Sequence, residues 1–385
     1  MPRPLAAPDP AGRLSGRLLS WFDAHCRDLP WRADRDPYRI WLAEVMLQQT
    51  QAERAAAYFT RFTARFPDAA SLAAAHEDEV LALWEGLGYY SRARNAMRAA
   101  RIMVAEHGGA PPRDRAALLA LPGVGPYTAG AVRSQAWDEP DAAVDANAER
   151  VLARLFDLDA PVKETASRKR LKTWAHGLLP PSRPGDFNQA LMELGALVCT
   201  PRTPDCRACP LADHCEALRL DIVSERPVPG KSRPVTPVVM ATGVLAWQGR
   251  LLIQKRPPRG VWAGLWEFPG GRVEPGETPG QAVVREFMEE TGLDVRVARP
   301  LPVVRHGYTT YSVALHGFLV EPRGREPGQV RLTAATEHRF AAPSDLAGLA
   351  FPAGMRKLMD AMRADADLAA RFPNLPPGPM AQTKP

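Results

Sequence analysis

No long hydrophobic run occurs in this sequence of 385 residues, and no stretch approaches the roughly twenty apolar residues of a membrane-spanning helix. The first ten residues are rich in Pro and Ala and contain no hydrophobic core of a secretory signal peptide. The chain is 45% hydrophobic and 24% charged, as is typical of globular proteins. We therefore expect a cytoplasmic protein that does not bind membranes.

Cysteine is scarce as well, and five residues in a chain of this length do not form a disulfide framework. Four of them are close together in the sequence: Cys199, Cys206, Cys209 and Cys215. One C-x-x-C pair between two wider gaps differs from the paired knuckles of structural zinc sites. Four thiolates on one short loop, residues 199–215, suit a [4Fe–4S] cluster, which we predict here. The fifth, Cys26, is expected to be a buried helical residue.

An excess of positive charge is missing from the first part of the chain. Residues 1–220 contain 28 Lys and Arg against 27 Asp and Glu, so the net charge of +6 arises mainly after residue 220. Any DNA-facing surface in the first part must therefore come from local clustering of charge. Arg202, Arg207 and His214 form one such cluster on the cysteine loop.

The most distinctive stretch runs from Leu121 to Gly130 and reads Leu-Pro-Gly-Val-Gly-Pro-Tyr-Thr-Ala-Gly. An apolar run ends at Pro-Gly, and a second helix is predicted to begin at Pro126, which suits the first helical position. Gly123 and Gly125 let the backbone approach a partner closely, and N–H groups at the start of a helix favour a phosphate. The alternative is an ordinary helical hairpin whose glycines only permit left-handed dihedral angles.

The periodicity of apolar residues divides the chain into two domains. From residue 11 to 221 they recur at three- and four-residue spacing, which predicts an all-α domain. Residues 222–237 contain four prolines and are expected to be a stiff linker. Residues 238–370 are predicted to be α+β, and residues 371–385 a disordered tail. The strands of the second domain are expected at residues 238–245, 250–254, 311–320 and 329–332.

One carboxylic acid lies within an apolar helical run of the first domain. Asp36 and Pro37 supply an N-cap and a first-turn proline for a predicted helix over residues 38–50, which contains Glu44. An acid among hydrophobic side chains loses hydration, which raises its pKa and prepares it to donate a proton near neutral pH. The alternative places Glu44 on the solvated side of the helix, as is usual for glutamate.

A glycine-hinged loop, Gly86 to Tyr90, carries two adjacent tyrosines and is followed by Arg92 and Arg94. Aromatic side chains beside basic ones suit a wedge that enters a stack of DNA bases. Packing of one tyrosine in the core is the alternative.

Three glutamates of the second domain, Glu286, Glu289 and Glu290, lie on one face of a predicted helix. Such a group is unfavourable unless a cation neutralises it, and oxygen ligands suit Mg²⁺; a solvated acidic helix end is the alternative. With Gly271, Glu277, Arg285 and Gly292, these residues match the complete signature of the Nudix hydrolases. The preceding Trp266 to Gly271 resembles the members that act on oxidised nucleotides.

With both halves considered, the chain resembles the MutY family of adenine DNA glycosylases, which remove adenine mispaired with 8-oxoguanine. The resemblance covers about residues 18–215 for a helix-hairpin-helix glycosylase domain and about 238–363 for a Nudix-related domain. The motifs that carry it are Leu29–Arg32, Glu44–Thr50, Gly86–Tyr90, the hairpin and the four cysteines.

The resemblance implies catalytic roles for four residues. Glu44 would be the general acid that protonates the departing adenine, and Asp145 would stabilise the sugar cation, with Asn147 holding that carboxylate. Breaking an N-glycosidic bond needs both a proton and nearby negative charge. Asp145 is also a candidate N-cap for a helix over residues 148–156. Tyr127 stands where bifunctional relatives such as endonuclease III carry a lysine that forms a Schiff base, so we predict base removal without strand cleavage.

The resemblance also implies contacts with double-stranded DNA that contains an A:8-oxoguanine or A:G mispair. The residues concerned are Trp31, Gln49, Thr50, Leu87, Tyr89, Gly123, Gly125, Glu193, Tyr308 and Thr309. Trp31 and Glu193 would line the pocket of the flipped adenine, and Gln49 and Tyr89 would lie beside the opposite base. Tyr308 and Thr309 stand where the family usually has Phe-Ser-His, whose serine contacts 8-oxoguanine.

The family's Nudix-related domain ordinarily lacks the acidic signature, which this chain keeps whole. This suggests a second activity, the Mg²⁺-dependent hydrolysis of oxidised dGTP, with retention of the motif without activity as the alternative. Two other hypotheses apply to the first domain: a thymine-mismatch glycosylase, and a non-enzymatic DNA-binding protein that uses an iron–sulfur cluster as a sensor. The resemblance further implies a monomer in the bacterial cytoplasm, associated with the nucleoid.

Overall fold

The computed structural model describes residues 12–230, 234–308 and 310–378. The chain forms two compact units, Met1–Ala74 with Asn95–Ser232 and Ala75–Arg94 with Arg233–Pro385. Residues 75–94 thus pack with the unit that contains the C-terminal half, although they lie within the stretch 11–221 of the predicted helical domain. Some residues of the predicted domains, linker and tail lie outside the described part, namely 11, 231–233, 309 and 379–385.

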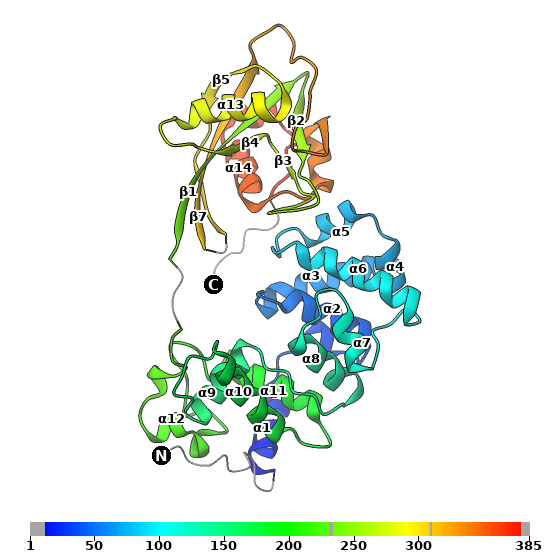
Figure 1. Ribbon diagram of the computed structural model, residues 1–385, viewed down its shortest axis with the longest axis vertical. Coiled ribbons are helices and arrows are strands. Elements are labelled where there is room, and N and C mark those ends of the chain that lie inside the picture. The colour runs from blue at the N-terminus through cyan, green and yellow to red at the C-terminus, as the bar shows by residue number, and fades with distance from the viewer. Residues whose placement is uncertain (1–11, 231–233, 309, 379–385) are drawn as a thin grey trace. The chain divides into compact units, whose positions relative to one another are not determined.

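The first unit is all-α, as predicted (Figure 1). Its helices are α1 (Arg13–His25), α2 (Pro37–Leu47), α3 (Ala52–Arg65), α4 (Ala69–Ala74), most of α6 (Ser91–Glu106), α7 (Arg115–Ala120), α8 (Pro126–Trp137), α9 (Ala146–Leu155), α10 (Thr165–Leu178), α11 (Pro184–Leu197) and α12 (Glu216–Arg219). Short 3-10 turns lie at η1 (Pro30–Arg32), η2 (Ala212–His214) and η3 (Val223–Glu225). Within the described part of the chain, every helix is too short or too polar to cross a bilayer.

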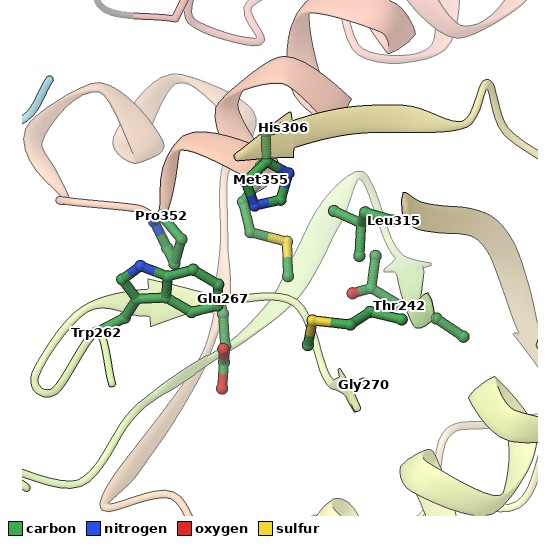
Figure 2. Close-up of a pocket in the computed structure, with 11 residues that line it drawn as sticks. Thr242, Trp262, Glu267, Gly270, His306, Leu315, Pro352 and Met355 are labelled. Carbon is green, nitrogen blue, oxygen red and sulfur yellow. The ribbon is translucent and has the colours of Figure 1, made fainter. Parts of the chain in front are cut away.

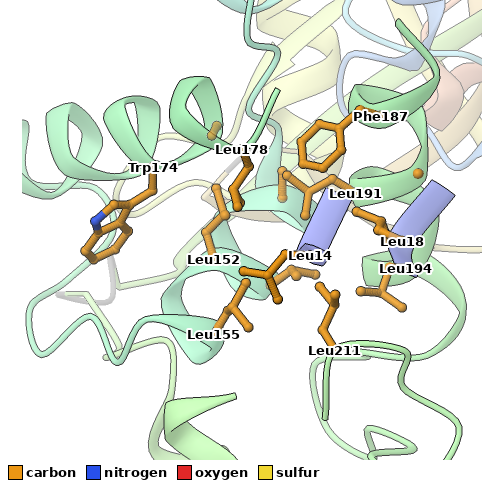
Figure 3. Packing of buried hydrophobic residues seen from close by; sticks show 14 of the residues in the cluster. Leu14, Leu18, Leu152, Leu155, Trp174, Leu178, Phe187, Leu191, Leu194 and Leu211 are labelled. Atoms are coloured by element: carbon orange, nitrogen blue, oxygen red, sulfur yellow. The ribbon is translucent and has the colours of Figure 1, made fainter. Parts of the chain in front are cut away.

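Helices α1, α9, α10 and α11 enclose one apolar core (Figure 3). Leu18 from α1, Leu152 from α9 and Phe187 from α11 are almost completely buried in it. Helices α9 and α11 can approach closely because Gly195 has no side chain. A Cβ atom added there would lie only 2.6 Å from the Cβ atom of Asn147. This contact places the start of α9 firmly against α11.

Helices α7 and α8 form the predicted hairpin. Asp114 caps α7 by accepting a hydrogen bond from the Ala117 N–H group at 2.8 Å. In the turn, Gly123 has a φ of 81°, whereas Gly125 is the extended N-cap of α8 and Pro126 is its first residue. Only Gly123 therefore needs a left-handed backbone, and the proline begins the helix as expected.

Helix α2 ends at Leu47, three residues before the predicted end. The chain turns there because Gln48 leaves the helical conformation, with a ψ of 107°, and Gln49 is left-handed, with a φ of 60°. Cys26 follows the end of α1 and is exposed, so the prediction of a buried helical cysteine is wrong.

The second unit contains one eight-stranded sheet of order β3-β2-β1-β7-β5, with β4 paired to β1, β6 to β7 and β8 to β2. The strands are β1 (Thr236–Trp247), β2 (Arg250–Lys255), β3 (Trp266–Glu267), β4 (Gly270–Arg272), β5 (Val295–Pro300), β6 (Val304–Tyr308), β7 (Tyr311–Pro322) and β8 (Glu337–Ala341). Strands β1 and β7 are parallel, with Ala241 opposite His316, and the other pairs are antiparallel.

Helices cover both faces of this sheet. Helix α13 (Pro279–Thr291) packs on one face and α14 (Ala353–Ala364) on the other, the latter with the turn η4 (Pro343–Gly348) and α15 (Ala366–Arg371). Residues 329–332 are not a strand, contrary to the prediction. Phe372 and Leu375 are buried in the apolar core between the sheet and α14. The chain therefore stays packed beyond residue 371, the predicted start of the disordered tail.

The close approach of α9 and α11 gives a stability prediction. We expect Gly195→Ala to lower the free energy of unfolding by about 1–3 kcal/mol, because the added methyl group overlaps Asn147. The matched control is Gly16→Ala in α1, where a Cβ atom meets nothing within 4 Å and helix propensity should add about 0.5–1 kcal/mol. Urea unfolding of both variants tests this, and equal effects would contradict the proposed packing.

Candidate active site

Two carboxylates and a phenol come together where α2, α8 and α9 meet. The Tyr127 hydroxyl of α8 donates to Oε2 of Glu44 on α2 at 2.7 Å. Burial raises the pKa of Tyr127 well above 10, and the nearby charges of Glu44 and Asp145 raise it further. The three side chains predicted to carry the chemistry therefore lie in one site, with Tyr127 as a neutral phenol.

Glu44 is buried, with only 3% of the residue exposed, so it does not lie on a solvated side of α2. Its second oxygen, Oε1, accepts a hydrogen bond from the Gln135 amide at 2.9 Å. Burial raises the pKa of Glu44, although the hydrogen bonds from Tyr127 and Gln135 act in the opposite direction. The environment therefore favours a protonated acid, as its apolar neighbours in the sequence predicted.

Asp145 is the N-cap of α9 and is half-buried. Its Oδ1 accepts from the Ala148 N–H group at 2.7 Å, and its Oδ2 accepts from the Asn147 amide at 2.9 Å. Burial raises the pKa of Asp145, but these hydrogen bonds oppose the rise because they stabilise the ionised form. The capping role and the proximity to Glu44 are thus both present, and the cap fixes the orientation of the carboxylate.

Asn147 connects this carboxylate to the cysteine loop. Its side-chain oxygen accepts from Arg150 Nη2 at 2.8 Å, and the same nitrogen donates to the Gly195 carbonyl at 2.8 Å. Arg150 Nε also donates to the Cys199 carbonyl at 2.7 Å. No sequence pattern marked Arg150, or Gln135 beside Glu44, because each role depends on a partner distant in the sequence.

The four clustered cysteines are free, half-buried thiols. Arg154 Nη1 donates to Cys199 Sγ at 3.3 Å and to the Thr200 carbonyl at 2.8 Å. Burial raises the pKa of Cys209 to about 11, and negative charge on the other three cysteines acts in the same direction. The thiols are therefore close enough to interact, yet in the described residues no three His, Cys, Asp or Glu side chains form a site for a single metal ion.

Glu193 is an ion-paired residue rather than an acid near neutral pH. Arg27 donates to both of its oxygens at 2.8 Å, and Arg32 Nη2 lies 3.2 Å from Oε2. Although burial acts to raise it, the hydrogen bonds from Arg27 and Arg32 lower the pKa of Glu193 to about 2. Trp31, which precedes Arg32 in the sequence, is buried and packs edge-on against Phe59.

The predicted DNA-facing residues of the hairpin and of the α2 end lie side by side. Gln48 Nε2 contacts the Gly123 carbonyl at 3.4 Å and the Thr128 hydroxyl at 3.3 Å. Gln49 and Gly123 are exposed, while Thr50 and Gly125 are half-buried. The turn after α2 and the hairpin turn are thus joined by these hydrogen bonds.

The remaining predicted DNA contacts belong to the second unit. Tyr89 is 40% exposed, whereas Leu87 and Tyr90 are buried, so the two tyrosines take the two alternative positions expected for this loop. Tyr308 ends β6, but its side chain and the whole of Thr309 lie outside the described residues.

The acidic residues of α13 are held by one arginine. Arg285 lies within 3.0 Å of Glu286 Oε1, Glu289 Oε2 and Glu277 Oε1. Glu290 Oε2 instead accepts from the Gly270 N–H group at 3.0 Å and from Gln254 at 2.8 Å. The carboxylates therefore form an organised network beside β4, not an acidic helix end surrounded only by solvent.

A small pocket is lined by residues of the second unit (Figure 2), among them Gly270, whose N–H group binds Glu290 of the network. Its lining includes Thr242, Trp262, Glu267, His306 and Met355. Both ring nitrogens of His306 are buried and have no hydrogen-bond partner among the described residues. Burial raises the pKa of Glu267 to about 7, against the effect of the neighbouring Arg256. The pocket is apolar with a few polar groups, as ligand sites generally are.

The buried acid gives a prediction that needs no assumption about function. Because the folded protein holds the pKa of Glu44 above its unfolded value, stability is highest below the unfolded pKa and is lost as pH rises through the folded pKa. Glu44→Gln avoids this loss, and we expect its free energy of unfolding to exceed that of the wild type by about 1–3 kcal/mol at pH 8. The difference should shrink toward pH 4 in urea titrations. A difference that does not change with pH would contradict a raised pKa.

Comparisons with known proteins agree with this two-part organisation. A model of the HhH-GPD superfamily of base excision DNA repair proteins matches residues 42–176, and a NUDIX domain model matches residues 241–361. The solved structure of a thermostable thymine-DNA glycosylase is 30% identical with a TM-score of 0.50, over 54% of this chain and 97% of that one. The predicted fold class, a helical glycosylase domain followed by a Nudix-like domain, is confirmed.

Curated relatives match most of the chain. The adenine DNA glycosylase of Mus musculus is 39% identical over 341 residues, which cover 75% of this chain and 65% of the mouse protein. That of Rattus norvegicus is 38% identical over 361 residues, or 78% of this chain and 70% of the rat protein. The chain thus spans about two thirds of the length of these relatives. It belongs to the adenine DNA glycosylase family.

Proposed function

We propose that this protein is a monofunctional base excision repair enzyme that removes adenine mispaired with 8-oxoguanine or guanine. The observation that carries the proposal is the meeting of buried Glu44, Asp145 and neutral Tyr127 in one site. Hydrolysis of an N-glycosidic bond requires a proton for the leaving base and negative charge beside the developing sugar cation. The two carboxyl groups differ in burial and partners in a way that suits these two tasks.

Glu44 suits the role of the acid because it is the more deeply buried of the two and so holds its proton more tightly. Asp145 suits the anion because it sits at the N-terminus of α9, where the helix dipole and the Ala148 N–H group favour negative charge. Once the base has left with the proton, the Glu44 carboxylate can accept a proton from the attacking water. Asn147 keeps the Asp145 carboxylate oriented during the reaction.

Tyr127 supports base removal without strand cleavage. Its hydroxyl donates to Glu44 and contacts the Met192 sulfur at 3.3 Å. A phenol cannot form the Schiff base by which a lysine cleaves the strand. Its raised pKa also keeps it protonated, so it orients the acid rather than attacking the sugar.

The cysteine loop fits a [4Fe–4S] cluster that Cys199, Cys206, Cys209 and Cys215 would hold. The thiols are unpaired by disulfides, they interact electrostatically, and Arg154 donates to one of them. Four thiolates on one short loop are the ligands that such a cluster takes in proteins. Such a cluster would stabilise the loop that Arg150 joins to the start of α9.

Single-turnover base release from defined duplexes tests this proposal. We expect adenine release from A:8-oxoguanine and A:G duplexes, intact strands until alkali is added, and no thymine release from T:G duplexes. Glu44→Gln should reduce the rate by about 10²–10⁴-fold, the usual contribution of a general acid. Release of thymine in preference to adenine would favour the thymine-mismatch alternative. Duplex binding without any base release would favour the non-enzymatic sensor.

A second function, Mg²⁺-dependent hydrolysis of oxidised dGTP, is favoured by the carboxylate network of α13. Glu286 closely approaches Gly271, where an added Cβ atom would lie 2.1 Å from Oε1, so this glycine leaves room for the carboxylate. Glu290 is oriented by Gly270 and Gln254, and the pocket beside Glu267 gives the nucleoside a place next to these carboxylates. Oxygen ligands of this kind suit Mg²⁺, which would polarise the phosphate chain.

Pyrophosphate release from oxidised dGTP by the full-length protein tests the second function. We expect Mg²⁺-dependent turnover that falls by about 10–100-fold in Glu290→Gln, because a ligand-type carboxylate is lost. Glu321→Gln is the matched control, since it removes an exposed glutamate of the same unit that pairs with Arg296. Equal rates in the wild type and in Glu290→Gln would show that the motif is retained without activity.

A further inference from the structure

Residues 75–94 are joined to the C-terminal half of the chain by a buried ion pair. Glu85, directly after α5 (Glu77–Trp84), accepts from Arg356 of α14 through both oxygens, with Nε to Oε1 at 2.8 Å and Nη2 to Oε2 at 2.9 Å. Glu85 is 7% and Arg356 3% exposed. A two-point pair of this kind fixes orientation as well as distance.

Backbone contacts extend the same junction. The Phe351 N–H group donates to Glu85 Oε1 at 2.9 Å, and the Tyr90 hydroxyl donates to the Phe351 carbonyl at 3.2 Å. Arg356 also donates to the Leu346 and Leu349 carbonyls at 3.0 and 2.6 Å. Glu85 and Tyr90, which flank the glycine-hinged loop, are thus both held by the segment between η4 and α14.

The loop between these two anchors has a defined shape. Gly86, Gly88 and Tyr89 have positive φ angles of 100°, 72° and 46°. Arg92 Nη2 donates to the Leu87 and Gly88 carbonyls at 3.0 and 3.1 Å. The loop presents Tyr89 to solvent while Leu87 and Tyr90 are buried, so the direction of the Tyr89 ring depends on how the loop ends are held.

We infer that Arg356 is a positioning residue for Tyr89: through Glu85 it sets the direction in which the loop presents the ring to the base stack. The inference rests on the proposed function for the identity of the ligand, a mispaired DNA duplex. An arginine is required because the ammonium group of a lysine cannot bind both carboxylate oxygens and two carbonyls in the same plane. Arg356 of the C-terminal half thereby acts on the DNA-facing loop through Glu85, without itself contacting the Tyr89 ring.

A double-mutant cycle between Arg356→Lys and Tyr89→Ala tests the inference in the full-length protein. The duplex carries 2-aminopurine next to 8-oxoguanine, and its fluorescence rises when a side chain opens the stack. We expect Arg356→Lys to reduce this rise to the level of Tyr89→Ala. It should also raise the duplex concentration for half-maximal base release about tenfold, as expected for one lost base–aromatic stack, with the rate at saturating duplex unchanged. In the Tyr89→Ala background, Arg356→Lys should change neither quantity further.

Two further variants separate positioning from a general loss of stability. Glu85→Gln keeps an acceptor for the Phe351 N–H group but weakens the pair, and it should give the same fluorescence loss as Arg356→Lys. Arg299→Gln breaks the partly exposed ion pair with Asp365 in the same unit and should leave the fluorescence unchanged. A full fluorescence rise in Arg356→Lys, or effects that add to those of Tyr89→Ala, would overturn the inference. If the wild type releases no base but the fluorescence of the single and double variants follows the expected pattern, only the proposed function is overturned.

Discussion

The burial of the Glu44 carboxyl group beneath Tyr127 is the constraint on which the first unit's site depends. Burial makes the carboxylate unfavourable, and the positive charge of Arg32 offsets this only in part, so the side chain retains its proton to higher pH than it does in water. The Tyr127 hydroxyl and the Gln135 amide orient the group without neutralising it. Because α2 supplies the acid and α8 both donors, the contact between these two helices determines the protonation state of the site.

Helix α9 connects the second carboxylate to the cysteine loop. Its cap is Asp145, its first turn carries Asn147, and Arg150 and Arg154 bind the loop around Cys199. Since these residues share one short helix that packs tightly on α11 at Gly195, the carboxylate and the cysteine loop cannot move independently. The orientation of the anion is thus a property of the whole helix rather than of a single hydrogen bond.

Local features of the sequence predicted much of this arrangement, whereas contacts between distant residues could not be predicted from it. The helical periodicity, the proline at the start of α8 and the cap at Asp145 depend on neighbours within a few residues, so they could be read directly. The grouping of residues 75–94 with the C-terminal half could not, because Glu85 and Arg356 are 271 positions apart. Short strands such as β3 and β4 were not predicted for a similar reason, since they are stabilised by pairing with β2 and β1, which lie elsewhere in the sequence.

Infrared spectroscopy of the Glu44 carboxyl group measures the central claim most directly. The difference spectrum between the wild type and Glu44→Gln isolates the C=O band of the protonated acid, and the band can be followed as pH is raised. The account predicts that this band persists above the ordinary glutamate pKa of about 4.3 and is lost only at higher pH. Loss of the band near that ordinary value would show that Glu44 is ionised at neutral pH and would contradict its role as the proton donor.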